Sequence, residues 1–490
     1  MTVTLVVECD WSGDGDFADA NENITALVHR ASWGHGRKGI LGAASPGRLE
    51  LLLDNEDRRF SPENGTSPLF GLMEPGRTVR VRSTAPFAKT LFVGALDDIE
   101  PDPQLDGKTA LLTAYEKSLV KIREAGPIWT VMQTNIGPGQ AVTAILDEIG
   151  WPVGDRNIDQ GTTVMDTWWA SGIDALQALG EMVDEDLGYL FVQGDGKLRF
   201  EGRAYRATHA SDAVAVTFDD TPSSAFRYEG IAYARGIGAG GSLYNIARAP
   251  AQRRALVADY VTLWTCQEVP VRMAPGEVRD FIATWDNPSG DLAFTVFNRQ
   301  ANSAPDATGT DLTSSLTWTL MNEHATRATI RVTNNYASTA YITVLNLSVK
   351  ARQISGRESE AEQSVTPADR RFPVQPRYVG DLNQAQAWVE YVILTYGLPT
   401  PIVTLELFAY NSSMETELLK REPSDLIGIQ NDELGMDAKF WVESVEHQVA
   451  GPGGLWKTRL VCSKQVSAKT YWLMETTGFG EIEQTTRLFG

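Results

Sequence analysis

The sequence predicts a mainly β protein with α+β modules, and three observations carry this prediction. Short segments of alternating apolar and polar residues recur in residues 1–125 and again after residue 400, as they do in strands of half-buried sheets. Apolar residues at helical spacing occupy residues 138–186, and a threonine-rich alternating stretch fills residues 256–352. Because a chain of 490 residues is too long for one core, we expect about three to four domains.

Residues 1–125 are predicted to be a run of strands. The segment TLVVECDW is apolar and β-branched, GRLELLLDN and RTVRVRS alternate, and LFVGALDDIEP is followed by TALLTAYEKSL after a turn at residues 105–108. Short strands at regular spacing are typical of a small barrel or a sandwich. We therefore expect an N-terminal β domain over residues 1–125.

Residues 126–235 are predicted to combine helices with a hairpin. Helical spacing, with proline in the first turn and glycine at the end, predicts one helix over residues 138–150. A second helix is expected over residues 173–186, and YLFVQGDGKLRFEGR predicts a hairpin that turns at its central glycines. This segment should form a compact linking module.

The glycine-dense segment 236–255 is expected to be a linker that leads into a β-sandwich over residues 256–352. Gly236, Gly238 and Gly241 match the G-x-G-x-x-G spacing, but a phosphate cradle also needs a helix that starts at these glycines. The residues that follow lack an amphipathic period and soon reach Pro250. We assign no dinucleotide site here. The alternating segments DLAFTVFN and ATIRVTNN, separated by asparagine-containing turns, indicate the sandwich.

Residues 353–466 are predicted to form a second barrel-type domain with a helix over residues 381–396. Its strands are IVTLELFAY, KFWVESVEHQV and LWKTRLVCSKQ, and His447 within them is expected at a surface or lining a barrel. The C-terminal extension, residues 467–490, contains several aromatic residues without a clear period. We expect it to pack against its own chain or a neighbour.

Charge and cysteine usage exclude several classes of protein. With 43 Lys and Arg against 63 Asp and Glu, the net charge of −20 disfavours binding to a phosphate backbone and favours simple solubility. The three cysteines, Cys9, Cys266 and Cys462, lie far apart, so buried, reduced thiols are expected rather than a disulfide framework. The first apolar run is too short for a membrane span, and we expect neither an export signal nor a transmembrane helix.

Catalytic motifs are scarce. The sequence contains no G-x-S-x-G elbow, no H-E-x-x-H helix, no Walker loop and no C-x-x-C pair. Two of its many carboxylates could in principle form a glycosidase pair, but the sequence does not place them. The paired Trp168 and Trp169 could form a ligand platform, although core packing is the stronger interpretation because paired aromatic residues usually supply apolar area.

One loop has the composition of a calcium site. The segment DWSGDGDFADANE places oxygen-bearing side chains at loop positions one, three and five, with Gly15 at position six, as in a loop that wraps a hard cation. Position twelve is an asparagine rather than the usual bidentate glutamate, and a strand precedes the loop, so a hairpin turn rich in Asp and Gly is the alternative. The candidate calcium ligands are Asp10, Ser12, Asp14, Asp16, Asn21 and Glu22.

Taken in order, these parts resemble the tail-tip or baseplate hub proteins of long-tailed bacteriophages. RTVRVRSTAPFAKTLFVGALDDIEPDP resembles the long hairpin of their first tail-tube-like barrel. TVMQTNIGPGQAVTAILDEIGWP and ALQALGEMVDEDLGYLFVQGDGKLRFEGR resemble the module between the barrels. RYVGDLNQAQAWVEYVILTYGLPTPIVTLEL and KFWVESVEHQVAGPGGLWKTRLVCS resemble the second barrel, whereas the sandwich looks like a jelly-roll insertion. GRLELLLDNEDRRFSPENGTSPLFGLMEPGR is similar to tail proteins of siphophages.

The resemblance implies a non-enzymatic structural hub with two tail-tube-like β-barrels per subunit. It implies a homotrimer that continues a sixfold tube and closes its end at the tail tip of the virion, after assembly in the host bacterial cytoplasm. The implied partners are the distal tail or tail tube protein, the tape measure protein, and tail fibre or receptor-binding proteins, with roles in host attachment and genome ejection. DNA would be met only in passage, and an acidic lumen would repel it.

Two other functions stay open at this point. A carbohydrate-binding tail adhesin would use Trp264, Trp285 or Trp318 of the sandwich as stacking platforms. A cell-wall glycoside hydrolase would use a pair of carboxylates.

Overall fold

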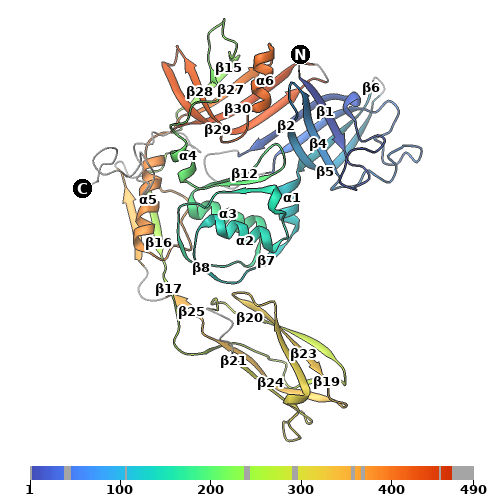
Figure 1. The fold of residues 1–490 in the computed structure, drawn as a ribbon, viewed down its shortest axis with the longest axis vertical. Helices are drawn as coiled ribbons and strands as arrows, with labels where there is room; N and C mark the ends of the chain where they lie inside the picture. The colour runs from blue at the N-terminus through green and yellow to red at the C-terminus, as the bar shows by residue number, and fades with distance from the viewer. Residues whose placement is uncertain are drawn as a thin grey trace.

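The computed structural model describes residues 3–37, 46–104, 107–236, 243–289, 296–354, 359–365, 370–451 and 454–465. The protein is mainly β, as the sequence predicts, with helices concentrated in the middle of the chain and near its C-terminal end (Figure 1). Among the described residues, no helix combines the length and the apolar character needed to cross a membrane. Gly238, Gly241 and the extension 467–490 lie outside the described residues.

The N-terminal part of the chain forms half of one large sheet. Its strands lie in the order β1-β4-β5-β6-β3-β2 and alternate between buried and exposed residues, so that one sheet face is apolar. A short 3-10 turn, Thr25–Leu27, precedes β2. The bounds are β1 Thr4–Cys9, β2 Val28–Gly36, β3 Arg48–Asp54, β4 Thr78–Ala85, β5 Lys89–Gln104 and β6 Gly107–Glu116.

The C-terminal part continues the same sheet in the order β29-β30-β27-β15, with β2 paired directly to β29. Strand β29 serves two neighbours, because its first half pairs with β28 and its second half with β2. The bounds are β14 Thr217–Phe218, β15 Gly230–Ala234, β27 Ile402–Phe408, α6 Ser412–Lys420, β28 Leu426–Asn431, β29 Met436–Val449 and β30 Trp456–Lys464. Strands β14 and β15 precede the sandwich in sequence yet pair with β28 and β27 of this half.

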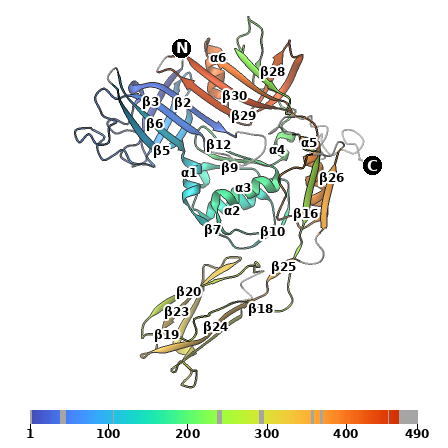
Figure 2. The ribbon, with the colours of Figure 1, turned by 180° about the vertical axis from the view of Figure 1, so that it is seen from behind.

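The linking module lies beneath the large sheet (Figures 1 and 2). Both helices and the hairpin that the sequence predicts are confirmed as α2, α3 and β12-β13. Helix α3 begins because the Asp174 carboxylate accepts hydrogen bonds from the Leu176 and Gln177 amides. Helix α1, Lys117–Glu124, precedes residues 126–235 but packs into the core of this module. The other bounds are β7 Pro127–Trp129, β8 Gln133–Ile136, α2 Pro138–Glu148, β9 Arg156–Ile158, β10 Met165–Trp168, β11 Ser171–Asp174, α3 Ala175–Asp186, β12 Tyr189–Val192, β13 Leu198–Glu201 and α4 Ala204–Thr208.

Two short strand pairs form a stalk that carries the sandwich at the far end of the long axis (Figures 1 and 2). The stalk strands are β16 Ile246–Ala251, β17 Arg254–Leu256, β25 Arg352–Ile354 and β26 Ser359–Ser364, and helix α5, Leu382–Tyr396, packs on β16 and β26. The sandwich strands are β18 Val261–Thr265, β19 Val271–Met273, β20 Val278–Thr284, β21 Val296–Asn302, β22 Leu316–Met321, β23 Arg327–Asn334 and β24 Ala340–Val349.

The buried apolar residues form separate cores. One core joins side chains of both sheet halves, from Val3 to Ala114 and from Val403 to Cys462, and a second fills the linking module. The sandwich and the α5 region each have a core of their own. All three cysteines are buried and free, as expected. Because the two sheet halves share a core, neither half buries its apolar face alone.

Candidate functional site

The two halves of the large sheet meet along one strand pair, which we call the seam. Strand β2 pairs with the second half of β29, from Ala31 opposite Val449 to Gly36 opposite Ser444. Gly36 has a φ of +106°, and a Cβ there would lie 2.4 Å from the Glu443 carbonyl oxygen. Because a side chain would be strained in both respects, glycine at this position allows the two strands to approach.

An aromatic cluster lies under the seam. The ring of Trp33 lies 5.0 Å from His447 and 6.2 Å from Trp456. The Trp456 indole donates to His447 Nδ1 over 3.2 Å; an indole nitrogen can only donate, so Nδ1 accepts and the ring proton lies on Nε2. Burial lowers the pKa of His447 to about 3. Of the two places expected for His447, the surface is excluded, because its ring is buried beneath the seam.

A buried ionic cluster, centred on Glu443, ties the seam to the linking module. The Glu443 carboxylate accepts from Arg37 Nε at 2.7 Å, from Arg206 Nη1 at 2.6 Å and from the Ser463 hydroxyl. Burial opposes its charged form, but Arg206 and Arg37 outweigh burial and lower the pKa of Glu443 to about 2. The guanidinium carbons of Arg37 and Arg206 each lie 3.9 Å from the centre of the Tyr189 ring. Arg37, directly after β2, and residues of β12, α4, β29 and β30 thus meet at one point.

A second buried acid, Glu422, joins three other segments. Its carboxylate lies 3.1 Å from His35 Nε2 and 2.7 Å from Lys89 Nζ, and it accepts from the Gly194 amide at 3.1 Å. Burial works against ionisation, yet His35 and Lys89 lower the pKa of Glu422 to about 2. Nearby, burial raises the pKa of Glu116 to about 7 against the opposing effects of the Gly47 amide and His35. Paired, desolvated charges of this kind fix the relative positions of the segments that carry them.

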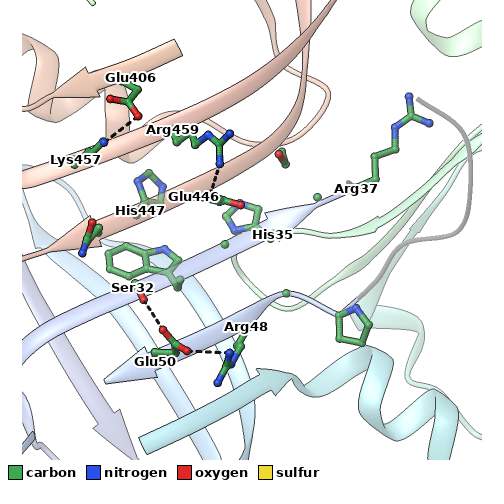
Figure 3. A pocket seen from close by; sticks show the side chains of 17 residues that line it. Ser32, His35, Arg37, Arg48, Glu50, Glu406, Glu446, His447, Lys457 and Arg459 are labelled. Carbon is green, nitrogen blue, oxygen red and sulfur yellow. Dashed lines mark hydrogen bonds and ion pairs between the residues drawn. The ribbon is translucent and has the colours of Figure 1, made fainter. Parts of the chain in front are cut away.

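The outer face of the seam is a shallow pocket of about 540 Å³ (Figure 3). Its charged side chains are paired across neighbouring strands, Lys457 with Glu406 at 3.0 Å and Arg459 with Glu446 at 3.7 Å. Arg48 pairs with Glu50 of its own strand, β3, at 2.9 Å. These interactions are typical of a solvated sheet face.

The candidate calcium ligands in the acidic loop after β1 differ in how far they are exposed to solvent. Asp10 and Glu22 are buried, whereas Asp14, Asp16 and Asn21 are exposed. Asp10 accepts from the Gly13 and Gly15 amides and, at 3.3 Å, from the Ser12 hydroxyl, and Glu22 accepts from the Asp19 amide. Within the described residues, no three His, Cys, Asp or Glu side chains are grouped to hold a metal ion. Calcium binding here stays a prediction.

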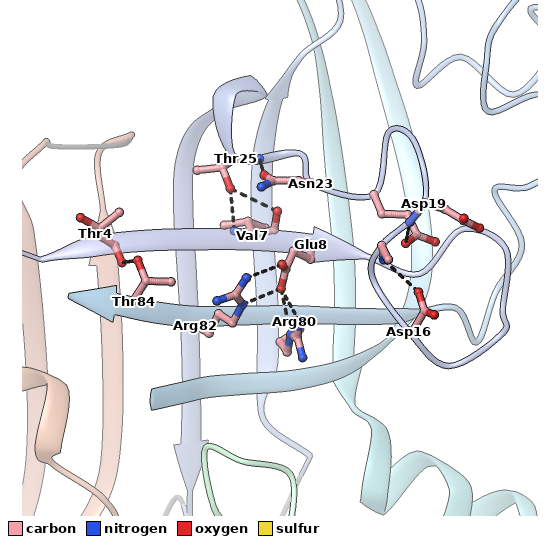
Figure 4. A network of polar contacts seen from close by, with 12 residues as sticks. Thr4, Val7, Glu8, Asp16, Asp19, Asn23, Thr25, Arg80, Arg82 and Thr84 are labelled. Atoms are coloured by element: carbon pink, nitrogen blue, oxygen red, sulfur yellow. Dashed lines mark hydrogen bonds and ion pairs between the residues drawn. The ribbon is translucent and has the colours of Figure 1, made fainter. Parts of the chain in front are cut away.

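The same region contains an ionic clamp that the sequence analysis missed (Figure 4). The buried Glu8 of β1 accepts hydrogen bonds from both Arg80 and Arg82 of β4 at distances of 2.7–2.9 Å. Burial opposes its ionisation, but the two arginines lower the pKa of Glu8. The period-two spacing of Arg80 and Arg82 in RTVRVRS puts both side chains on one strand face, and this was the signal available in the sequence.

The tryptophans considered as ligand platforms lie in two places, three in the sandwich and two in the linking module. Trp285 is buried, and its indole donates to the Ala325 carbonyl oxygen, while Trp264 and Trp318 pack against the sandwich core. Trp168 is buried in the core of the linking module, as the core-packing interpretation predicts, whereas Trp169 is partly exposed.

Comparison with known proteins places this architecture among tail proteins at the level of the fold. No family model matches the sequence, and no curated protein matches it. The crystal structure of the tail protein from Neisseria meningitidis MC58 aligns with a TM-score of 0.51 at 9% identity, over 96% of this chain and 98% of that one. The chain has the fold of that tail protein.

Two further solved structures align at lower scores. The prophage MuSo2 43 kDa tail protein from Shewanella oneidensis has a TM-score of 0.47 at 10% identity, covering 95% of this chain and 99% of its own. Prophage tail protein gp18 from Listeria monocytogenes has a TM-score of 0.43 at 8% identity, covering 94% of each chain. The tail-protein fold expected from the resemblance is confirmed by the likeness to the Neisseria structure.

Proposed function

We propose that this chain is a structural protein of a bacteriophage tail and forms the hub of the tail tip as a ring of three. The observation that carries the proposal is the seam, which joins two sheet halves into one continuous sheet with one buried and one solvated face. A wide sheet of this kind can form a long segment of a ring wall. The tail-protein fold of the Neisseria structure supports the same role.

The solvated face of this sheet carries more acidic than basic side chains. The register places Glu50, Asp98 and Glu446 on this face, with Ser32 and Gln448 between them. The acidic side chains are Glu8, Glu50, Asp54, Asp98, Glu100, Asp102, Glu406, Asp437 and Glu446, and the basic ones are Arg30, Arg48, Arg80, Arg82, Lys439, Lys457 and Arg459. We propose that this face lines a channel through which DNA passes, because an acidic wall repels the phosphate backbone.

The buried ionic clusters suit a part that must hold its shape. Glu443 and Glu422 connect both sheet halves to the linking module through charge-assisted hydrogen bonds and ion pairs, which are stronger than neutral hydrogen bonds. In the proposed hub, this rigidity would keep the channel wall fixed while tail tube, tape measure and fibre proteins bind around it. The tail-tip location in the virion belongs to the same proposal.

The assembly state of the purified full-length chain tests this proposal. Size-exclusion chromatography with light scattering, followed by native mass spectrometry, should give a closed trimer, because symmetric rings are the usual form of such oligomers. A hexamer, or a monomer that persists at high protein concentration, would contradict the ring of three. The sandwich-deletion variant described below provides a matched sample with the same sheet.

A further inference from the structure

A pocket of about 620 Å³ lies where the stalk leaves the main body, apart from the seam. The linking module contributes Trp169 and Asp184, the stalk contributes Arg254, and the segment before α5 contributes Arg377 and Tyr378. Three separate parts of the chain therefore build its walls. Its volume falls within the range of sites that bind small ligands.

Aromatic side chains form one wall of this pocket. The rings of Trp169 and Tyr378 meet edge to face with their centres 5.8 Å apart, and the Arg254 guanidinium lies 4.9 Å from the centre of the Trp169 ring. The backbone holds this arrangement, since the Arg254 amide donates to Asp166 and the Asp166 amide donates to the Tyr378 carbonyl oxygen. The wall is therefore in place before any ligand binds.

Arg254 is a half-buried cation without an acidic partner. Within the described part of the chain, its guanidinium forms no hydrogen bond and no ion pair, and the ring of Trp169 is its neighbour. Burial lowers the pKa of Arg254, and Tyr378 opposes this shift only in part. The Arg254 guanidinium is therefore a cationic donor in the pocket wall with which a bound anion can form charge-assisted hydrogen bonds.

Asp184 is an unpaired carboxylate in the same pocket as the unpaired guanidinium of Arg254. Its carboxylate forms no hydrogen bond or ion pair with any described residue. The neighbouring Glu181, by contrast, forms an ion pair with Arg377 and accepts a hydrogen bond from the Tyr378 hydroxyl. Burial raises the pKa of Asp184. A ligand that pairs with both residues must therefore have one negatively charged group that binds Arg254 and hydrogen-bond donors that bind Asp184.

We propose that this pocket binds a saccharide unit that carries a carboxylate, such as a uronic or sialic acid of a bacterial surface glycan. The carboxylate pairs with Arg254, ring hydroxyls donate to Asp184, and the C–H face of the sugar packs on the aromatic wall. A phosphate monoester or nucleotide would bring about two negative charges next to the unpaired carboxylate of Asp184, which would repel it more strongly than the single charge of a sugar carboxylate. This inference is independent of the proposed hub function.

Calorimetry and saturation-transfer NMR on the full-length chain test the site, with glucuronic acid and N-acetylneuraminic acid as probes and glucose as the uncharged counterpart. Both acidic sugars should bind, and glucose should bind at least about tenfold more weakly because it cannot pair with Arg254. Arg254→Gln should weaken acidic-sugar binding by about tenfold or more, and Arg254→Lys should restore part of it.

Arg253→Gln is the matched control, because Arg253 is adjacent and exposed and does not line the pocket. It should leave binding unchanged. The proposal is overturned if the folded chain binds neither acidic sugar, if Arg254→Gln has no effect, or if Arg253→Gln weakens binding equally. It is also overturned if a glutamate-rich peptide occupies the pocket more tightly than either sugar, since the pocket would then be a docking groove for protein.

Discussion

Glu443 shows most clearly how single residues hold this protein together. Its carboxylate is buried and joined to Arg37, 406 positions earlier in the chain, and to Arg206 of the linking module. Removing one member of such a cluster leaves the remaining charges buried and uncompensated. The next acidic residue on the same strand, Glu446, is exposed and lies 3.7 Å from Arg459.

Glu443→Gln should therefore destabilise the protein severely, by about 3–5 kcal/mol, because two buried arginines lose their counter-charge. Glu446→Gln, its matched control, should change stability by about 1 kcal/mol or less, as exposed pairs do. Chemical denaturation of both variants at neutral pH measures the two effects. Equal effects of the two substitutions would show that the Glu443 cluster does not hold the junction.

The raised pKa of Glu116 predicts a dependence of stability on pH. Burial favours the protonated form, so the folded chain holds this proton up to about pH 7, whereas an unfolded glutamate releases it near its ordinary value of 4.5. The contribution is complete below pH 4.5 and is lost as the pH rises to about 7, at a cost of about 3 kcal/mol. Glu116→Gln should remove this loss.

The expected result is thus a variant that is more stable than the parent at pH 8 and equal to it at pH 4. Thermal unfolding across this range measures it, with Glu124→Gln as the exposed control. Glu443 and Glu422 act in the opposite direction, because their lowered pKa values make stability fall as the pH drops from about 4.5 towards 2. A Glu116→Gln curve parallel to that of the parent would contradict the assignment.

Calcium binding by the loop after β1 is tested on the full-length chain, because the N-terminal sheet half shares its core with the C-terminal half. If the loop binds calcium, adding the ion should raise the melting temperature and a chelator should reverse this, since a ligand of the folded state stabilises it by mass action. Asp14→Ala should abolish the response. An unchanged melting temperature in the parent would leave the loop as a turn capped by its own carboxylates.

At the scale of elements, local sequence signals predicted the parts of the chain that local interactions build. The helices of the linking module follow from apolar spacing with proline and glycine at the ends, and the 189–201 hairpin follows from its central glycines. The seam could not be predicted from local signals, because the pairing between β2 and β29 joins residues that are far apart in the sequence. The buried acids were also missed, since Glu443 looks like any polar position in an alternating strand.

The sandwich is attached to the rest of the protein through few contacts. Two stalk pairs carry it, and a hydrogen bond from the Ala325 amide to the Thr130 carbonyl oxygen, with a contact between Ser171 and Thr326, braces it against the linking module. Because Arg254 faces Ile354 across the stalk, the two chain ends left by its removal lie close together. This geometry suits an inserted, peripheral unit.

Replacing residues 256–352 by a short Gly/Ser linker should therefore leave the oligomer intact, since the large sheet and its core do not include the sandwich. Light scattering of the shortened chain should give the same number of subunits as the parent. A soluble but monomeric product would place the sandwich in the subunit interface, and the proposal that the sandwich is a peripheral insertion would be wrong.

At the scale of the whole molecule, the expected tail-protein fold is confirmed, while the hub, its symmetry and its partners are proposals. The composition predicts the acidic balance, and the structure places some of these acidic residues on the solvated face of a sheet that runs through both halves. Assembly cannot be read from one chain's sequence, because complementary surfaces of neighbouring subunits determine it.

The most direct test of the central claim is a cryo-electron microscopy reconstruction of phage particles in which this chain is labelled. The account predicts three copies in a ring at the tail tip, with Glu50, Asp98 and Glu446 facing the central channel. A label elsewhere on the particle, six copies, or a ring whose channel is lined by other surfaces of the chain would contradict it.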